Sequence, residues 1–134
     1  MLLQVGVKAL LKNKEGKYLL VRRNPKKYPD VPASWDMPGG RIEPGTGLLE
    51  NLKREILEET QLALAIEPQL VAAQDIFPPD KHVVRLTFVG EIEGIAVVDE
   101  ENTEARWFAA EEILTMTDLD KFLQKLLDSK TIRL

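Results

Sequence analysis

The apolar positions of this chain alternate with the spacing of strands over much of its length. Two short apolar runs, residues 5–11 and 17–23, flank the turn-like sequence of residues 13–16, a pattern typical of a β-hairpin. Further strands are predicted at residues 68–76, 82–93 and 106–108. In the second of these segments, Val84, Leu86 and Phe88 fall on one side, opposite Arg85 and Thr87.

Three other segments repeat their apolar residues with helical spacing. The clearest is residues 48–60, and two more helices are predicted at residues 111–116 and 119–127. Strands on both sides of a central helix, with more helix at the end, predict an α/β layered domain with a mixed sheet. A length of 134 residues suits a single domain.

Charge and composition narrow the classes of protein that the chain can belong to. The 22 acidic and 18 basic side chains give a net charge of −4, which argues against binding duplex nucleic acid or an anionic membrane by bulk charge. The chain has no cysteine, which excludes disulfides, thiolate zinc sites and cysteine nucleophiles. Residues 1–11 are apolar but too short for a bilayer span, so we expect no anchor and a cytoplasmic location.

The central predicted helix carries acidic side chains beside its apolar stripe. With Leu48 taken as the origin and about 100° per residue, Glu55 and Glu59 both fall within about 20° of it. Like charges four residues apart repel, and partial burial adds a desolvation cost. A divalent cation such as Mg²⁺, which prefers carboxylate oxygens, would remove that penalty.

An ordinary solvated helix face is the alternative interpretation, with Arg54 paired to Glu50 and Glu58 one turn away on either side. The preceding segment favours a functional site instead. Residues 35–47 hold four of the eight glycines of the chain, and such a stretch is typical of a backbone that approaches another group closely.

The same region resembles the signature of a known family. Residues 40–62 read GRIEPGTGLLENLKREILEETQL, which resembles the Nudix box GX5EX7REUXEEXGU, where U is a bulky apolar residue, and residues 35–39 resemble its lead-in. The resemblance implies a Nudix-type α/β/α sandwich with a central mixed β-sheet, formed as one domain over residues 1–134.

Two positions depart from the Nudix pattern. Thr46 stands at the place of the first glutamate, which in the family supports the loop and the helix arginine, so Arg54 would need Glu43 or Glu50 as a partner. Thr46 itself is a candidate N-cap of the helix. Gln61 replaces a glycine that would relieve a left-handed turn, and we expect it to alter only the helix end.

The resemblance also implies an activity, which is hydrolysis of a pyrophosphate bond in a small nucleotide by attack of water. The substrate class is a nucleoside triphosphate or a nucleoside diphosphate linked to another moiety. By position, Glu55 and Glu59 would bind Mg²⁺ or Mn²⁺ with the Gly39 carbonyl, Glu58 would be a further ligand, and Arg54 would orient the carboxylates.

The general base stays open between two places. In the family it is either a box glutamate, here Glu58, or a glutamate from the loop before the last strand of the sheet. Glu104 is the first choice in that loop because it lies nearest to the strand, and Glu101 is the second. A solvated acidic loop explains either residue equally well.

Recognition of the substrate calls for basic and acidic side chains near the site. Arg22 and Arg23 end a predicted strand on opposite faces, and Arg41 follows the two glycines, so each is a candidate for binding phosphate. Asp118 and Asp120 lie near the position of purine-reading acids in relatives that remove oxidised nucleotides. At the start of a helix, however, an aspartate is more often a cap.

Three alternatives concern function and assembly. Thr46 favours a catalytically weak Nudix-like module that binds a nucleotide. An RNA-end pyrophosphohydrolase would need a basic groove built from residues 22–27. Dimers are common among Nudix proteins, so residues 5–11 or the last helix are candidates for a homodimer interface, although such apolar stripes are more often core.

Overall fold

The computed structural model describes residues 1–30, 32–98 and 102–134. Both the predicted hairpin and the predicted helix at residues 48–60 are present, while two short strands around the glycines were not predicted. In chain order the elements are β1 (Leu2–Lys12), β2 (Tyr18–Arg23), β3 (Trp35–Asp36), β4 (Gly39–Arg41), α1 (Leu48–Thr60), β5 (Gln69–Ile76), β6 (Lys81–Glu91), β7 (Asn102–Phe108), α2 (Ala110–Leu114) and α3 (Lys121–Asp128).

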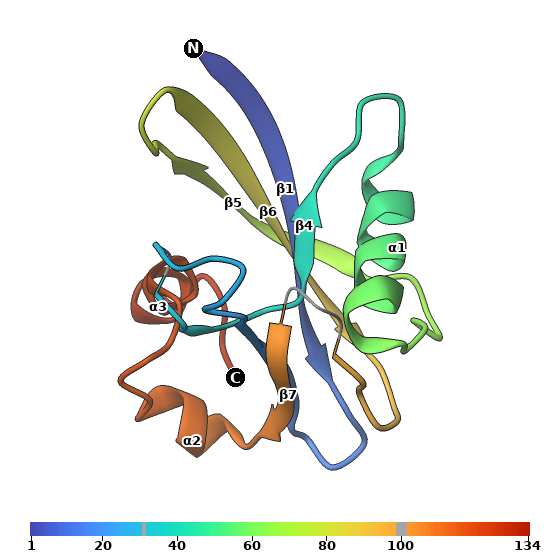
Figure 1. Ribbon diagram of the computed structural model, residues 1–134. Coiled ribbons are helices and arrows are strands. Elements are labelled where there is room, and N and C mark those ends of the chain that lie inside the picture. The colour runs from blue at the N-terminus through green and yellow to red at the C-terminus, as the bar shows by residue number, and fades with distance from the viewer. Residues whose placement is uncertain (31, 99–101) are drawn as a thin grey trace.

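The strands form one mixed sheet in the order β3-β2-β1-β6-β5. The pairing of β1 with β6 is parallel over the whole of β1, and the other pairs are antiparallel. The hairpin strands β1 and β2 pair at Lys12 and Tyr18 beside their turn, and β3 then pairs with β2 while β4 pairs with β1. Because β1 and β2 separate beyond their turn, β4 of the glycine segment can pair with β1 within the sheet (Figure 1).

Helices cover both faces of this sheet, with α1 on one side and α2 and α3 on the other (Figure 1). Because side chains alternate along a strand, β1 contributes Val7, Ala9 and Leu11 to the core beneath α1 and Leu10 to the core beneath α3. The layers are those of the expected α/β/α sandwich. Within the described ranges, no helix combines the length and the apolar character that a membrane span requires.

The polar side of β6 is buried as well, because α3 covers the face that carries it. Arg85 is only 7% exposed, and its guanidinium lies 2.8 Å from Asp36 and 3.2 Å from Asp120. Lys8 Nζ lies 3.3 Å from the same Asp36 carboxylate. Burial alone would raise the pKa of Asp36, but the charges of Lys8 and Arg85 outweigh it and lower the pKa. The alternation predicted two sides for β6 but not that the polar one is covered.

The two ends of α1 test the expectations about Thr46 and Gln61. The expectation that Thr46 caps the helix is wrong, since Gly47 is the N-cap residue and no side chain caps this end. The Thr46 amide instead donates to the Glu43 carbonyl, so Thr46 belongs to the preceding turn. At the other end, Gln61 adopts the left-handed conformation that favours glycine, with φ 59° and ψ 20°.

Replacing Gln61 by glycine should therefore stabilise the fold. A residue with a Cβ atom pays a steric cost in the left-handed region, so we expect Gln61→Gly to raise the free energy of unfolding by about 0.5–1 kcal/mol. Urea unfolding measures this directly. Gln61→Ala keeps the Cβ atom and is the matched control; an equal gain from alanine would show that relief of the left-handed strain is not the cause.

Candidate functional site

Two glycines bring the backbone of β4 against the acidic face of α1. The Gly39 amide donates to Glu59 Oε2 at 3.1 Å. A Cβ atom on Gly40 would lie 2.6 Å from the carboxyl carbon of Glu55, and one on Gly39 would lie 2.0 Å from the Val7 carbonyl oxygen. Gly39 also has a φ of +148°, which side chains rarely tolerate. Gly39 therefore requires glycine, whereas a side chain at position 40 would displace the Glu55 carboxylate.

The two carboxylates at this contact are partly withdrawn from solvent. Glu59 is 5% exposed, and the Glu55 side chain is 15% exposed. The sequence predicted this pair at the edge of the apolar stripe, and α1 places both members beside the glycine segment of the sheet. Oxygen donors of this kind suit a hard divalent cation rather than a soft one.

Few side chains near Gly39 could bind a metal ion. Over residues 1–30, 32–98 and 102–134, no group of three or more acidic or histidine side chains is arranged to hold a metal ion. The third box glutamate, Glu58, has a side chain that is 56% exposed and ion-paired with Arg54. Two carboxylates fit Mg²⁺, which commonly takes one or two protein carboxylates and completes its shell with water and substrate phosphate.

Arg54 lies at the centre of the acidic side chains. Its guanidinium is 3.2 Å from Glu55 and 3.2 Å from Glu58, and it is 3.6 Å from Glu43, one of the two partners proposed for it. Burial opposes the charged form of this arginine, but these carboxylates outweigh it and raise the pKa of Arg54. Arg54 therefore remains a cation that holds the neighbouring carboxylates in place.

Sequence reasoning missed one residue of this network, Asn51. It is fully buried, and its Oδ1 accepts a hydrogen bond of 2.7 Å from Arg54. Its Nδ2 donates to the carbonyls of Thr46 and Gly47. A signal was present, because a polar residue three positions before Arg54 and four before Glu55 lies on the same side of the helix as the carboxylates.

The candidates for the general base lie in and before β7. Glu104 is opposite Arg22 in the β2–β7 register, with 3.7 Å between their charged atoms, and its side chain is 44% exposed. Glu101 lies outside the described residues. The assignment of the base to Glu58, Glu104 or Glu101 therefore stays a prediction.

The three candidate arginines differ in their surroundings. Arg22 is bound to Asp118 at 2.6 Å and stacks over Trp35, whereas Arg23 stacks over Tyr28. Burial lowers the pKa of Arg41, and the positive charges of Arg23 and Arg85 lower it further. Arg41 adjoins Gly40, and its role in binding phosphate stays a prediction, as do those of Arg22 and Arg23.

The two candidate purine-reading acids both have structural partners. Asp120 is the N-cap of α3 and accepts hydrogen bonds of 3.0 Å from the amides of Phe122 and Leu123. It also pairs with Arg85, while Asp118 pairs with Arg22. The contacts of Asp120 match the capping role that the sequence already allowed for an aspartate at a helix start, whereas Asp118 makes an ion pair instead. A role in reading the base stays a prediction for both.

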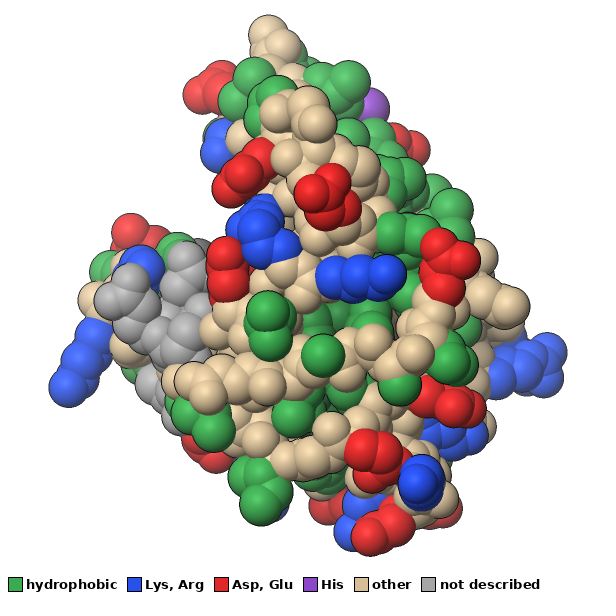
Figure 2. Space-filling view, turned by 90° about the vertical axis from the view of Figure 1, so that its right-hand side faces the viewer, with side chains coloured by type: hydrophobic (Ala, Val, Ile, Leu, Met, Phe, Trp, Pro, Cys, Tyr) green, Lys and Arg blue, Asp and Glu red, His purple; other side chains and the backbone are tan. Residues whose placement is uncertain are grey.

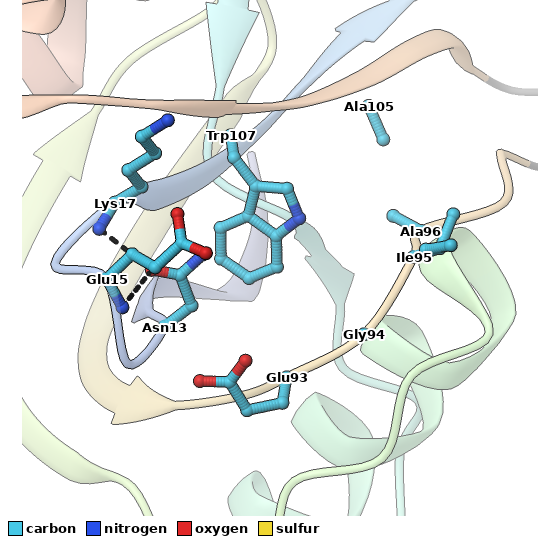
Figure 3. Close-up of a pocket in the computed structure, with 9 residues that line it drawn as sticks. All are labelled: Asn13, Glu15, Lys17, Glu93, Gly94, Ile95, Ala96, Ala105 and Trp107. Carbon is cyan, nitrogen blue, oxygen red and sulfur yellow. Dashed lines mark hydrogen bonds between the residues drawn. The ribbon is translucent and has the colours of Figure 1, made fainter.

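The surface on the α1 side has no single sign of charge. Acidic and basic side chains lie interspersed there (Figure 2). An open pocket of about 470 Å³ lies between the β1–β2 turn and β7, with the Trp107 indole facing Glu15 and Glu93 (Figure 3). None of the predicted site residues lines this pocket, so it contributes nothing to the arrangement around Gly39.

Comparisons with known proteins show which family this chain belongs to. The NUDIX domain family matches residues 2–129. Phosphatase NudJ of Escherichia coli (strain K12) is 31% identical over 108 residues, which are 78% of this chain and 68% of that protein. The crystal structure of the MutT protein from Methanosarcina mazei Go1 superposes with a TM-score of 0.82 at 26% identity, covering 96% of this chain and 92% of that one.

A third relative is matched over a shorter part of its length. A candidate 8-oxo-dGTP diphosphatase of Bacillus subtilis (strain 168) is 37% identical over 90 residues, which are 66% of this chain. The match spans only 54% of that relative. The family match covers nearly the whole chain and includes the two glycines, Arg54 and the carboxylates described above. The chain is therefore a member of the Nudix family.

Proposed function

We propose that this protein hydrolyses a pyrophosphate bond in a small nucleotide, with Glu55, Glu59 and the Gly39 carbonyl holding Mg²⁺ or Mn²⁺. The substrate is a nucleoside triphosphate or a nucleoside diphosphate linked to another moiety. One observation carries the proposal, namely the pair of largely buried carboxylates that lie against the backbone of Gly39 and Gly40. Two carboxylates this close repel one another, and a bound divalent cation would relieve that repulsion.

The bound cation would neutralise charge on the phosphates and activate the attacking water. The residues of the chain would orient the metal ligands and accept the proton of the attacking water. Glu59 is oriented by the Gly39 amide, and Glu55 is oriented by Arg54, so both carboxylates are fixed before substrate arrives. Gly40 has no side chain, which leaves room for the Glu55 carboxylate beside the backbone of β4. A glutamate, Glu58 or Glu104, would take the proton of the attacking water.

Arg41 supplies the positive charge for the phosphates in this proposal. Because burial, and then the charges of Arg23 and Arg85, lower the pKa of Arg41, an anion bound nearby would stabilise its cationic form. Arg41→Ala should raise KM about tenfold and change kcat little, since a loss of this size corresponds to about 1.4 kcal/mol of uniform binding. Steady-state kinetics on the preferred nucleotide measures both constants.

Arg133 is a suitable control for Arg41 because it is exposed and lies on the last segment of the chain, away from β4. Arg133→Ala should leave KM unchanged. An unaltered KM in Arg41→Ala as well would remove Arg41 from the phosphate site.

The two alternative functions receive less support. A basic groove for RNA ends would depend on residues 22–27, but Arg22 is neutralised by Asp118 and Glu104. The binding-module alternative rested on Thr46 leaving Arg54 without support, and Arg54 has other partners here. Hydrolysis is therefore the function that the site supports best.

A panel of nucleotides incubated with the protein and Mg²⁺ tests the proposal. We expect release of phosphate, pyrophosphate or a nucleoside monophosphate from at least one member, and none after chelation of the metal. Saturable binding of a nucleotide without turnover of any member would favour the binding module and contradict the proposed activity.

A further inference from the structure

The Nudix pattern places a glutamate at position 46, where this chain has Thr46, yet the loop and Arg54 are held together without it. The Glu43 carboxylate of the loop lies 3.6 Å from the Arg54 guanidinium, and a second side chain hydrogen-bonds to both the loop and Arg54, namely Asn51. It emerges from the second turn of α1 and is completely buried. A buried amide with all its polar atoms engaged is a rigid connector, because leaving any of them unpaired would be costly.

Asn51 engages three groups of the glycine loop. Its Nδ2 donates to the Thr46 carbonyl at 3.4 Å and to the Gly47 carbonyl at 3.3 Å, and its Oδ1 accepts from the Glu43 amide at 3.3 Å. The same Oδ1 accepts the shortest of these bonds, 2.7 Å, from Arg54 Nη2. One side chain thus ties the loop after β4 to the guanidinium.

We propose that Asn51 is a positioning residue of the site, which holds Arg54 and the loop of residues 43–47 in register and so performs the task of the missing acidic side chain at position 46. This inference rests on the proposed function. Asn51 acts on the carboxylates through Arg54. The Nη2 atom of Arg54 is also 3.2 Å from Glu55, and its Nη1 atom binds Glu58. Releasing the guanidinium would release the carboxylate that it orients.

Asn51→Ala and Asn51→Asp separate the contact with Arg54 from the contacts with the loop carbonyls. Alanine removes every bond, whereas aspartate keeps the acceptor for Arg54 and loses the donor to the Thr46 and Gly47 carbonyls. We expect alanine to weaken Mn²⁺ binding and to lower kcat by about ten- to hundredfold each, with little change in KM. Aspartate should keep most of the Mn²⁺ affinity although it unfolds at a lower temperature than the wild type.

Thr60→Ala is the matched control for loss of stability. Thr60 is equally buried in the same helix, and among the described residues its hydroxyl bonds to near neighbours in the sequence, the Ile56 carbonyl and the Leu62 amide. This variant should lower the unfolding temperature without changing Mn²⁺ affinity. All assays are run on folded protein, below the lowest unfolding temperature of the set.

The ¹⁵N–¹H resonance of the Arg54 Nε group reports on positioning without any turnover. We expect Asn51→Ala to shift it and to increase its motion, and Thr60→Ala to leave it unchanged. A wild-type protein that hydrolyses no nucleotide would defeat the proposed function while leaving this readout intact. An Arg54 signal and a Mn²⁺ affinity that change no more in Asn51→Ala than in Thr60→Ala would overturn the role of Asn51.

Discussion

Glu59→Gln should abolish metal-dependent hydrolysis and leave the fold intact. Glu59 contributes one of the two partly buried carboxylates, and its neutral analogue cannot supply the same charge to a cation. Loss of about 4 kcal/mol of charge stabilisation in the transition state corresponds to a fall of about a thousandfold in kcat. Steady-state kinetics with saturating Mg²⁺ measures the loss.

Stability should move in the other direction or not at all. The glutamine Oε1 can still accept the hydrogen bond from the Gly39 amide, and the change removes one member of a repelling pair of carboxylates. We therefore expect an unfolding temperature equal to or slightly above that of the wild type. Wild-type turnover in this variant would disprove the assignment of Glu59 as a metal ligand.

Arg85→Met should cause the largest loss of stability of any substitution considered. Arg85 is 7% exposed and lies between Asp36 and Asp120, so its removal leaves two carboxylates, each 20% exposed or less, without their arginine partner. Breaking a buried ion pair in this way costs about 3–5 kcal/mol. Urea unfolding at neutral pH measures the change in the free energy of unfolding.

Arg106→Met is the control for Arg85→Met. Arg106 is exposed and lies over the rings of Trp35 and Phe108, so its replacement should cost about 1 kcal/mol or less. Equal losses from the two variants would show that the buried ion pairs of Arg85 do not stabilise the fold.

The spacing of apolar residues in the sequence predicted α1, β5 and β6. Helical spacing over residues 48–60 gave the bounds of α1, and alternation located β5 and β6. The glycine-rich segment carries no alternation, so β3 and β4 could not be predicted. They exist because β1 and β2 separate after their turn, and that separation depends on pairings between distant segments.

The site was predictable where it followed one helix. The angles of Glu55 and Glu59 around α1 predicted that they share a face, and both lie against the glycines. The partners of Arg22, Arg85 and Asp120 come from other elements, which periodicity does not reveal. Asn51 was missed because its partners include backbone carbonyls of a loop whose path the sequence does not specify.

We propose that this chain cleaves a pyrophosphate bond by attack of water at a metal site formed by Glu55 and Glu59. The most direct test is turnover of the nucleotide panel in ¹⁸O-labelled water with Mg²⁺, followed by mass spectrometry of the products. We predict one ¹⁸O atom in a phosphate product of the wild type and no labelled product from Glu59→Gln. Unlabelled substrate throughout, with the nucleotide bound but uncleaved, would contradict the proposed hydrolysis.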